Sequence, residues 1–195
     1  MPHTGSESRG YSYRISAVTA LSGFLFGFDT AIINGAIVFL RRHFRWTEIE
    51  TEFAAGSLLA GCALGAAAAG ALSDRFGRKI VLLLSAVIFA LSSVATALPN
   101  GLGEFVAARV VAGTAIGIAS MLAPLYIAEV SPAAIRGRLV SMNQLAIVLG
   151  ILVSYLVGWA LSGLGEESWR WMFAAVAVPS VSFFGALFSL SLIHI

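Results

Sequence analysis

The chain has 195 residues, of which 58% are hydrophobic and 11% charged, and its formal net charge is +2. Soluble globular domains carry about 25% charged residues, so this composition excludes most water-soluble folds and indicates a membrane protein. Twelve basic and ten acidic residues form no basic stripe with interleaved aromatics, which argues against nucleic acid as a partner. A single cysteine, Cys62, provides neither a disulfide framework nor a metal cluster.

Residues 1–14 are polar and are expected to form a disordered cytoplasmic tail. Six apolar runs follow, and each is long enough to cross a bilayer as a helix, which takes about 20 residues. Such runs are too long for the strands of an outer-membrane barrel. We therefore expect an all-α membrane fold, a bundle of six transmembrane helices, with spans at residues 15–40, 53–72, 80–98, 102–127, 139–161 and 171–190.

Basic residues between the spans favour a cytoplasmic amino terminus, because cytoplasmic loops usually carry the excess of Lys and Arg. In this orientation the cytoplasmic side holds Arg9, Arg14, Arg75, Arg78, Lys79, Arg136 and Arg138, and the outer side holds Arg41, Arg42, Arg45 and Arg170. The outer arginine cluster at 41–45 runs against the rule, although three glutamates follow it closely.

Glycines spaced four residues apart occur in three of the predicted spans. This spacing lets two helix backbones approach closely in lipid, where small residues at the contact favour association. The pairs are Gly23 and Gly27, Gly61 and Gly65, and Gly113 and Gly117. Three such pairs predict a tightly packed bundle.

Two ionisable residues fall inside apolar spans, Asp29 in the first and Arg109 in the fourth. Each costs about 2.5–3.5 kcal/mol at the centre of a membrane helix, so both are expected to face a cavity or one another. If they are paired, the guanidinium favours the charged carboxylate, whereas the loss of water favours the protonated one. A movement that separates the pair could then bind or release a proton. A static salt bridge, or an Arg109 that reaches the membrane surface, is the alternative.

The fifth span carries neutral polar side chains, namely Asn143, Gln144, Ser154 and Tyr155. Amides and hydroxyls suit an uncharged polyhydroxylated ligand, because they donate and accept hydrogen bonds without requiring a counter-charge. Phe26 lies on the same helix face as Asp29, one turn earlier, and could contact the carbon face of a sugar. Each of these residues alone is more commonly an interhelical contact.

Two loops on the predicted cytoplasmic side carry complementary charges. The loop between spans two and three contains Asp74, Arg75 and Arg78, and a tight turn there needs a glycine. Asp74 is expected to cap the start of the third helix. Glu129, in the loop between spans four and five, is a natural partner for these arginines. Ion pairs that form in one state and break in another would make a gate, and simple anchoring is the alternative.

The chain resembles the sugar porter family of the major facilitator superfamily from roughly residue 14 to 190. Three segments carry the resemblance: Phe26 to Gly35, Gly70 to Lys79, and the long stretch from Arg109 to Gln144. Within this family the chain looks like the bacterial proton-coupled xylose, glucose and galactose transporters. The implied fold is the amino-terminal half of a twelve-helix transporter, in the cell (inner) membrane, that acts on a monosaccharide and a proton without a cofactor or a metal.

The resemblance also implies roles for individual positions. Asp29 and Arg109 match the proton-coupling pair, and Phe26 and Gln144 match sugar-binding positions. Asp74, Arg75, Arg78, Glu129 and Arg136 match the cytoplasmic gate network. At Ile151 similar xylose symporters have a second sugar-contacting glutamine, which leaves the identity of the sugar open.

The resemblance accounts for half of a transporter, because the family has twelve helices and this chain has six predicted spans. The carboxy-terminal six-helix half is therefore an expected partner. Back-translated, residues 190–195 fit the start of a widely used transposon sequencing adapter, so we hypothesise that the natural reading frame continues beyond them.

Three functions stay open on the sequence alone. The first is proton-coupled sugar symport, and the second is facilitative sugar uniport or transport of another organic solute. The third is a membrane sensor that transports nothing, or a six-helix assembly module. An enzyme is not expected, because the spans contain no histidine and no pairing of nucleophile and base.

Overall fold

The computed structural model describes residues 5–192 of the chain, and over this range it contains six long helices and no strand. The helices are α1 (Gly5–Phe44), α2 (Glu48–Phe76), α3 (Arg78–Ala97), α4 (Leu102–Val130), α5 (Ala133–Leu161) and α6 (Ser168–Leu192), with a short 3-10 turn at Ser162–Leu164. All six are long and apolar enough to cross a membrane. The expected all-α membrane bundle is confirmed.

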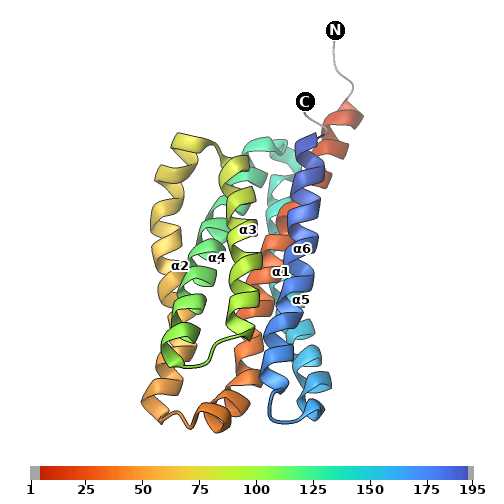
Figure 1. Cartoon of the computed structure of the whole chain (residues 1–195). Coiled ribbons are helices and arrows are strands. Elements are labelled where there is room, and N and C mark those ends of the chain that lie inside the picture. The colour runs from red at the N-terminus through yellow and green to blue at the C-terminus, as the bar shows by residue number, and fades with distance from the viewer. Residues whose placement is uncertain (1–4, 193–195) are drawn as a thin grey trace.

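The helices run up and down in alternation, so the connections gather at two ends of the bundle (Figure 1). The α2–α3 and α4–α5 connections lie at one end, near the two ends of the chain, and we call it the α2–α3 end. The α1–α2, α3–α4 and α5–α6 connections lie at the other, which we call the α1–α2 end.

Several helices extend beyond the apolar runs that predicted them. The polar segment before residue 15, expected to be disordered, is helical from Gly5, because adding a residue to an existing helix costs far less than starting one. α2 begins at Glu48, where Thr47 and Glu50 form a capping box: the Thr47 backbone N–H donates to Glu50 Oε2 at 2.8 Å, and the Glu50 N–H donates to Thr47 Oγ1 at 3.3 Å. The origin of residues 190–195 in a sequencing adapter stays a hypothesis. Residues 193–195 lie outside the described range.

Glycine contacts join α1 to α5 and α2 to α4. A Cβ atom at Gly27 would overlap the Ile147 carbonyl of α5, and one at Gly65 would overlap the Thr114 carbonyl of α4. The contacts are reciprocal, since a Cβ at Gly113 would meet the Leu58 carbonyl of α2. All three predicted glycine pairs therefore lie at helix contacts. A further glycine, Gly150 of α5, packs against the Phe24 backbone in the same way.

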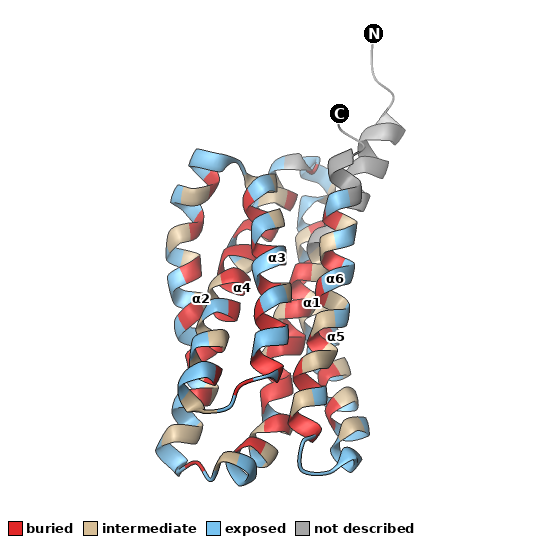
Figure 2. Ribbon diagram, viewed as in Figure 1, coloured by how far each residue is buried: buried red, intermediate tan, exposed pale blue. Residues whose placement is uncertain are grey.

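The bundle buries its helices unequally (Figure 2). The membrane-spanning parts of α1 and α4 are the most buried, those of α5 and α2 the least. α3 packs against α4 and α6, while α6 also packs against α1. The centre of the bundle is therefore built by α1 and α4, and the exposed apolar surfaces of α2 and α5 remain available to lipid or to further protein.

Candidate functional site

The two charged residues inside the apolar spans form an ion pair in the centre of the bundle. Arg109 Nη1 of α4 donates to both Asp29 carboxylate oxygens of α1, at 2.9 Å each. The side chains are 1% and 3% exposed. Because a buried ion is costly alone, the fold holds these two helices in a register that pairs their charges.

One side of the arginine is covered by an aromatic ring. The guanidinium carbon of Arg109 lies 5.4 Å from the centre of the Phe173 ring of α6, a distance at which the ring face attracts a cation. Phe173 in turn packs edge-on against Phe105 of α4, with ring centres 5.5 Å apart. This contact was not predicted from the sequence, because an aromatic residue in an apolar span is usually a packing residue.

The pair leaves hydrogen-bonding capacity unused. Arg109 Nε and Nη2 are buried without a partner among the described residues, and so is Thr30 Oγ1, next to Asp29. Buried donors without acceptors are rare and costly. If the bundle opens at this point, water or a rearranged side chain could form hydrogen bonds with these three buried groups.

The two predicted sugar-binding residues flank the seam between α1 and α5. Gly23 packs against Asn143 and Gly27 against Ile147, so Phe26 and Gln144 lie within about one helical turn of each other along the seam. Phe26 is half-buried and Gln144 exposed. The neighbouring Asn143 is buried instead, and its Oδ1 accepts no hydrogen bond from the residues that the structure describes.

Further along the seam, towards the α1–α2 end, polar and aromatic side chains line a cavity of about 250 Å³. Asn34 Nδ2 donates to the Tyr155 hydroxyl at 3.3 Å, and the buried Ser154 hydroxyl has no hydrogen-bond partner in the described part of the chain. Of the neutral polar residues predicted on the fifth span, Ser154 and Tyr155 therefore share one cavity, about one turn beyond Ile151.

The predicted gate residues meet in part at the α2–α3 end. Arg78 Nε donates to Glu129 Oε1 and Oε2 at 2.9 and 2.8 Å, and Arg78 Nη1 lies 3.4 Å from Asp74 Oδ1. Arg78 thus joins α3 to the end of α4 and to the end of α2. These side chains are partly exposed, so the ion pairs can open without leaving a charge in a dry interior.

Two other predicted gate residues lie apart from this cluster. Arg136 donates to the Ser131 carbonyl at 3.4 Å, and the Arg75 guanidinium lies over the Phe76 ring. Within the described range neither makes an ion pair. The predicted helix cap was wrong: Gly77, with a φ of 84°, turns the chain straight from α2 into α3, so Asp74 stays inside α2 and has no free helix start to cap.

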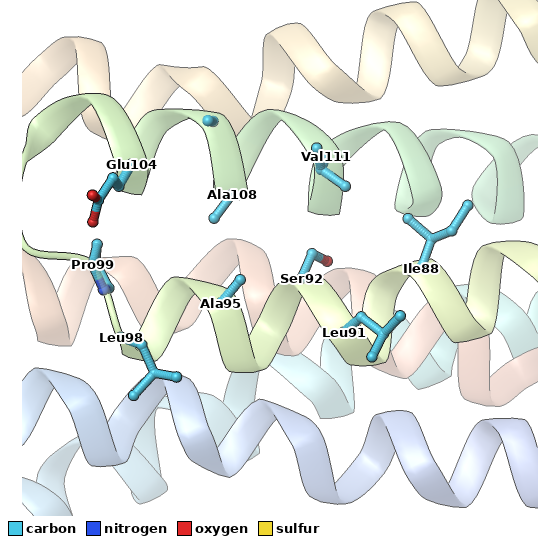
Figure 3. Close-up of a pocket in the computed structure, with 10 residues that line it drawn as sticks. Ile88, Leu91, Ser92, Ala95, Leu98, Pro99, Glu104, Ala108 and Val111 are labelled. Carbon is cyan, nitrogen blue, oxygen red and sulfur yellow. The ribbon is translucent and has the colours of Figure 1, made fainter.

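A different cavity, of about 650 Å³, lies between α3 and α4 near the α1–α2 end (Figure 3). Its lining is apolar except for Ser92 and Glu104, so it lacks the convergent polar groups of a sugar site. Among the described residues no group of three or more histidine, cysteine or acidic side chains could hold a metal ion.

Residues 15–191 match the family described as "Sugar (and other) transporter". The glucose transport protein of Synechocystis sp. is 46% identical over 178 residues, which cover 86% of this chain and 38% of that protein. The D-xylose-proton symporter of Escherichia coli is 39% identical over 92% of this chain and 43% of its own length. The chain therefore spans less than half the length of these curated relatives.

Solved structures agree with this match. The proton:xylose symporter XylE bound to 6-bromo-6-deoxy-D-glucose superposes with a TM-score of 0.87 and 37% identity, over 93% of this chain and 45% of that one. The inward-open form of XylE from E. coli superposes with a TM-score of 0.84 and 36% identity, over 92% of this chain and 48% of that one. The fold is the amino-terminal half of the major facilitator fold.

Proposed function

The chain belongs to the sugar (and other) transporter family, and from this premise we propose that it is the amino-terminal half of a proton-coupled monosaccharide symporter. The proposal places it in the cell (inner) membrane with its amino terminus in the cytoplasm. In this proposal the transporter moves the sugar across the membrane without changing it chemically, so it is not an enzyme.

The ion pair between Asp29 and Arg109 carries the proposal of proton coupling. A carboxylate 3% exposed and bound to a single guanidinium can exchange a proton only when the pair opens to water. Opening exposes Asp29 to protons from one side, and protonation removes the attraction that closes the pair. A facilitative uniporter needs no such group, so the cost of burying it favours symport over uniport.

The sugar site that we propose is one wall of a larger site. Phe26 and Gln144 supply an aromatic face and an amide near the midplane, where transporters of this architecture bind substrate between two halves. The facing wall would come from the carboxy-terminal half. The exposed α5 surface that carries Gln144 is consistent with such a partner.

The proposed transport movement is a rocking of this half that keeps its helix seams closed, while side chains rearrange locally at the Asp29–Arg109 and Arg78–Glu129 pairs. The bundle superposes almost equally well on XylE with a bound sugar analogue and on inward-open XylE, with TM-scores of 0.87 and 0.84. Glycine contacts along two helix seams would keep the helix backbones together during this movement, because a close-packed interface does not deform continuously. The Arg78–Glu129 pair would open and close at the cytoplasmic end.

The direct test is the movement of protons with sugar. Cells or vesicles that contain the complete transporter, lightly buffered and without an imposed gradient, receive a monosaccharide while the external pH is recorded. Symport predicts alkalinisation outside that requires the transported sugar and stops with a protonophore. Saturable sugar uptake without alkalinisation would indicate a uniporter, and the absence of saturable flux for any solute would indicate a sensor.

A further inference from the structure

Three arginines line one pocket at the α1–α2 end of the bundle, where the sequence already departed from the usual distribution of charge. The pocket has a volume of about 560 Å³, and Arg41, Arg42 and Arg45 all contribute to its lining. None of the described residues that line it is acidic. The rest of its wall is mainly apolar, from Ile37, Val38 and Trp46 of α1 and the connection that follows it.

Within the described range, Glu48 is the one nearby carboxylate that forms an ion pair with these arginines. Glu48 pairs with Arg41 at 3.2 Å, but Glu50 is held by Thr47 in the capping box. Within the described range, Arg42 and Arg45 make no ion pair, and both are exposed. Two guanidinium groups therefore remain free to bind an anion beside the partly engaged Arg41.

Arg45 also has an unusual backbone. Its φ is 54°, and it is the only non-glycine residue with a positive φ in the described part of the chain. A left-handed conformation is costly for a residue with a Cβ, and glycine would adopt it freely. Unfavourable backbone conformations persist most often where a side chain is needed. Arg45 is one of the residues that line the pocket, and a ligand for its side chain would be a reason to keep arginine at this turn.

The position of the pocket points to an amphiphilic ligand. It lies where one membrane-spanning helix ends, at Phe44, and the next begins, at Glu48, which is the level of the lipid headgroups. The half-exposed Val38 extends the wall from the arginines towards the hydrocarbon, where an acyl chain can follow.

We propose that this pocket binds the phosphate of an anionic phospholipid, with the guanidinium groups of Arg42 and Arg45 on the phosphate and the apolar wall along the first part of an acyl chain. Guanidinium groups bind phosphate oxygens through paired, charge-assisted hydrogen bonds. The lipid would fix the α1–α2 connection at one leaflet. This site is separate from the Asp29–Arg109 pair and does not depend on the proposed transport function.

The test uses the full 195-residue chain, purified in a neutral detergent and titrated with phosphatidylglycerol or with phosphatidylcholine of the same acyl chains. Native mass spectrometry counts the bound lipids. We expect one phosphatidylglycerol to bind more tightly than phosphatidylcholine. The double substitution Arg42→Gln and Arg45→Gln should weaken this binding about tenfold or more. The charge-matched control, Lys79→Gln with Arg138→Gln, removes two positive charges at the opposite end and should leave it unchanged.

Two further variants separate this site from general attraction and from folding defects. Val38→Trp fills the wall with no change of charge and should weaken phosphatidylglycerol binding. Arg45→Gly relieves the backbone and should raise the thermal stability of the lipid-free chain while weakening the binding. Equal binding by the arginine double variant and the parent chain would overturn the proposal, and so would an equal loss in the charge-matched control. Displacement by millimolar inorganic phosphate would assign the pocket to a soluble anion instead and overturn the lipid assignment.

Discussion

Arg109 donates from one nitrogen, Nη1, to both carboxylate oxygens of Asp29 at 2.9 Å, although the two residues lie on different helices and 80 positions apart in the sequence. Its other two nitrogens find no acceptor among the described residues. A guanidinium used on one nitrogen only is held less firmly than one bound through two. The pair is therefore shielded from water, but two of the Arg109 nitrogens lack a hydrogen bond within the described range. This makes the closed pair weaker than a fully bonded one, as expected of a contact that opens during transport.

The first prediction concerns the stability of this pair. Arg109→Gln leaves a buried carboxylate without its counter-charge and should lower the free energy of unfolding by about 3–5 kcal/mol. The double variant Asp29→Asn with Arg109→Gln should lose much less, because no isolated charge remains. Thermal unfolding of the four proteins of this cycle measures the coupling. If the two single losses simply add, the two side chains do not interact in the folded protein.

The second prediction concerns Phe173, the ring beside the Arg109 guanidinium. Phe173→Leu keeps a large apolar side chain but removes the ring face. It should lower the free energy of unfolding by about 1–2 kcal/mol in addition to the loss from changed packing. The same change in an Arg109→Gln background should cost less, because no cation remains over the ring. An equal cost in both backgrounds would restrict Phe173 to packing.

The third prediction tests the glycine seam between α1 and α5. Gly27→Ala places a methyl group against the Ile147 carbonyl and should destabilise the bundle by about 1–3 kcal/mol, because the helices must separate. Gly185 of α6 has open space around its Cβ direction. Gly185→Ala is therefore the matched control, and it should stabilise the chain by about 0.5–1 kcal/mol through helix propensity. A neutral Gly27→Ala would mean that the seam is looser than the structure shows.

The fourth prediction concerns the ion pair between Arg78 and Glu129. Both side chains are partly exposed, at 29% and 41%, so Glu129→Gln should change the stability by less than about 1 kcal/mol. In the complete transporter it should change the transport rate, because the proposed gate uses this pair in only one of its two states. The charge exchange Arg78→Glu with Glu129→Arg should restore part of the rate. Glu166→Gln, at the opposite end of the bundle, is the control, and an equal effect there would remove the pair from the gate.

The sequence indicated the central pair because a charged side chain in an apolar helix is stable only where it faces a cavity or an opposite charge. Asp29 and Arg109 carry opposite charges, so each can neutralise the other. The glycine spacing likewise predicted close contacts. It could not say which helices meet, since this depends on the whole arrangement of six spans. The partner seam on α5 was detectable in principle, because Ala146, Gly150, Ser154 and Gly158 keep the same four-residue spacing with small side chains.

The ion pairs at the α2–α3 end were harder to predict in detail. Opposite charges in two loops at one end indicated contact between Glu129 and the arginines, but not which arginine would reach it. The contact with Arg78 depends on the sharp turn at Gly77. Because α3 begins directly after this glycine, at Arg78, the Arg78 side chain reaches Glu129 at the end of α4. The same turn removed the cap expected from Asp74. Phe173 could not be predicted, because its contact with Arg109 depends on the packing of α6 against the centre.

The central claim is that Asp29 couples sugar movement to the proton gradient, and it is tested most directly by Asp29→Asn in the complete transporter, reconstituted in vesicles. Labelled monosaccharide is followed in two assays, accumulation driven by an imposed proton gradient and exchange between equal concentrations on the two sides. We predict that accumulation against the sugar gradient is lost while exchange continues. Accumulation at the level of the unchanged protein would contradict the claim.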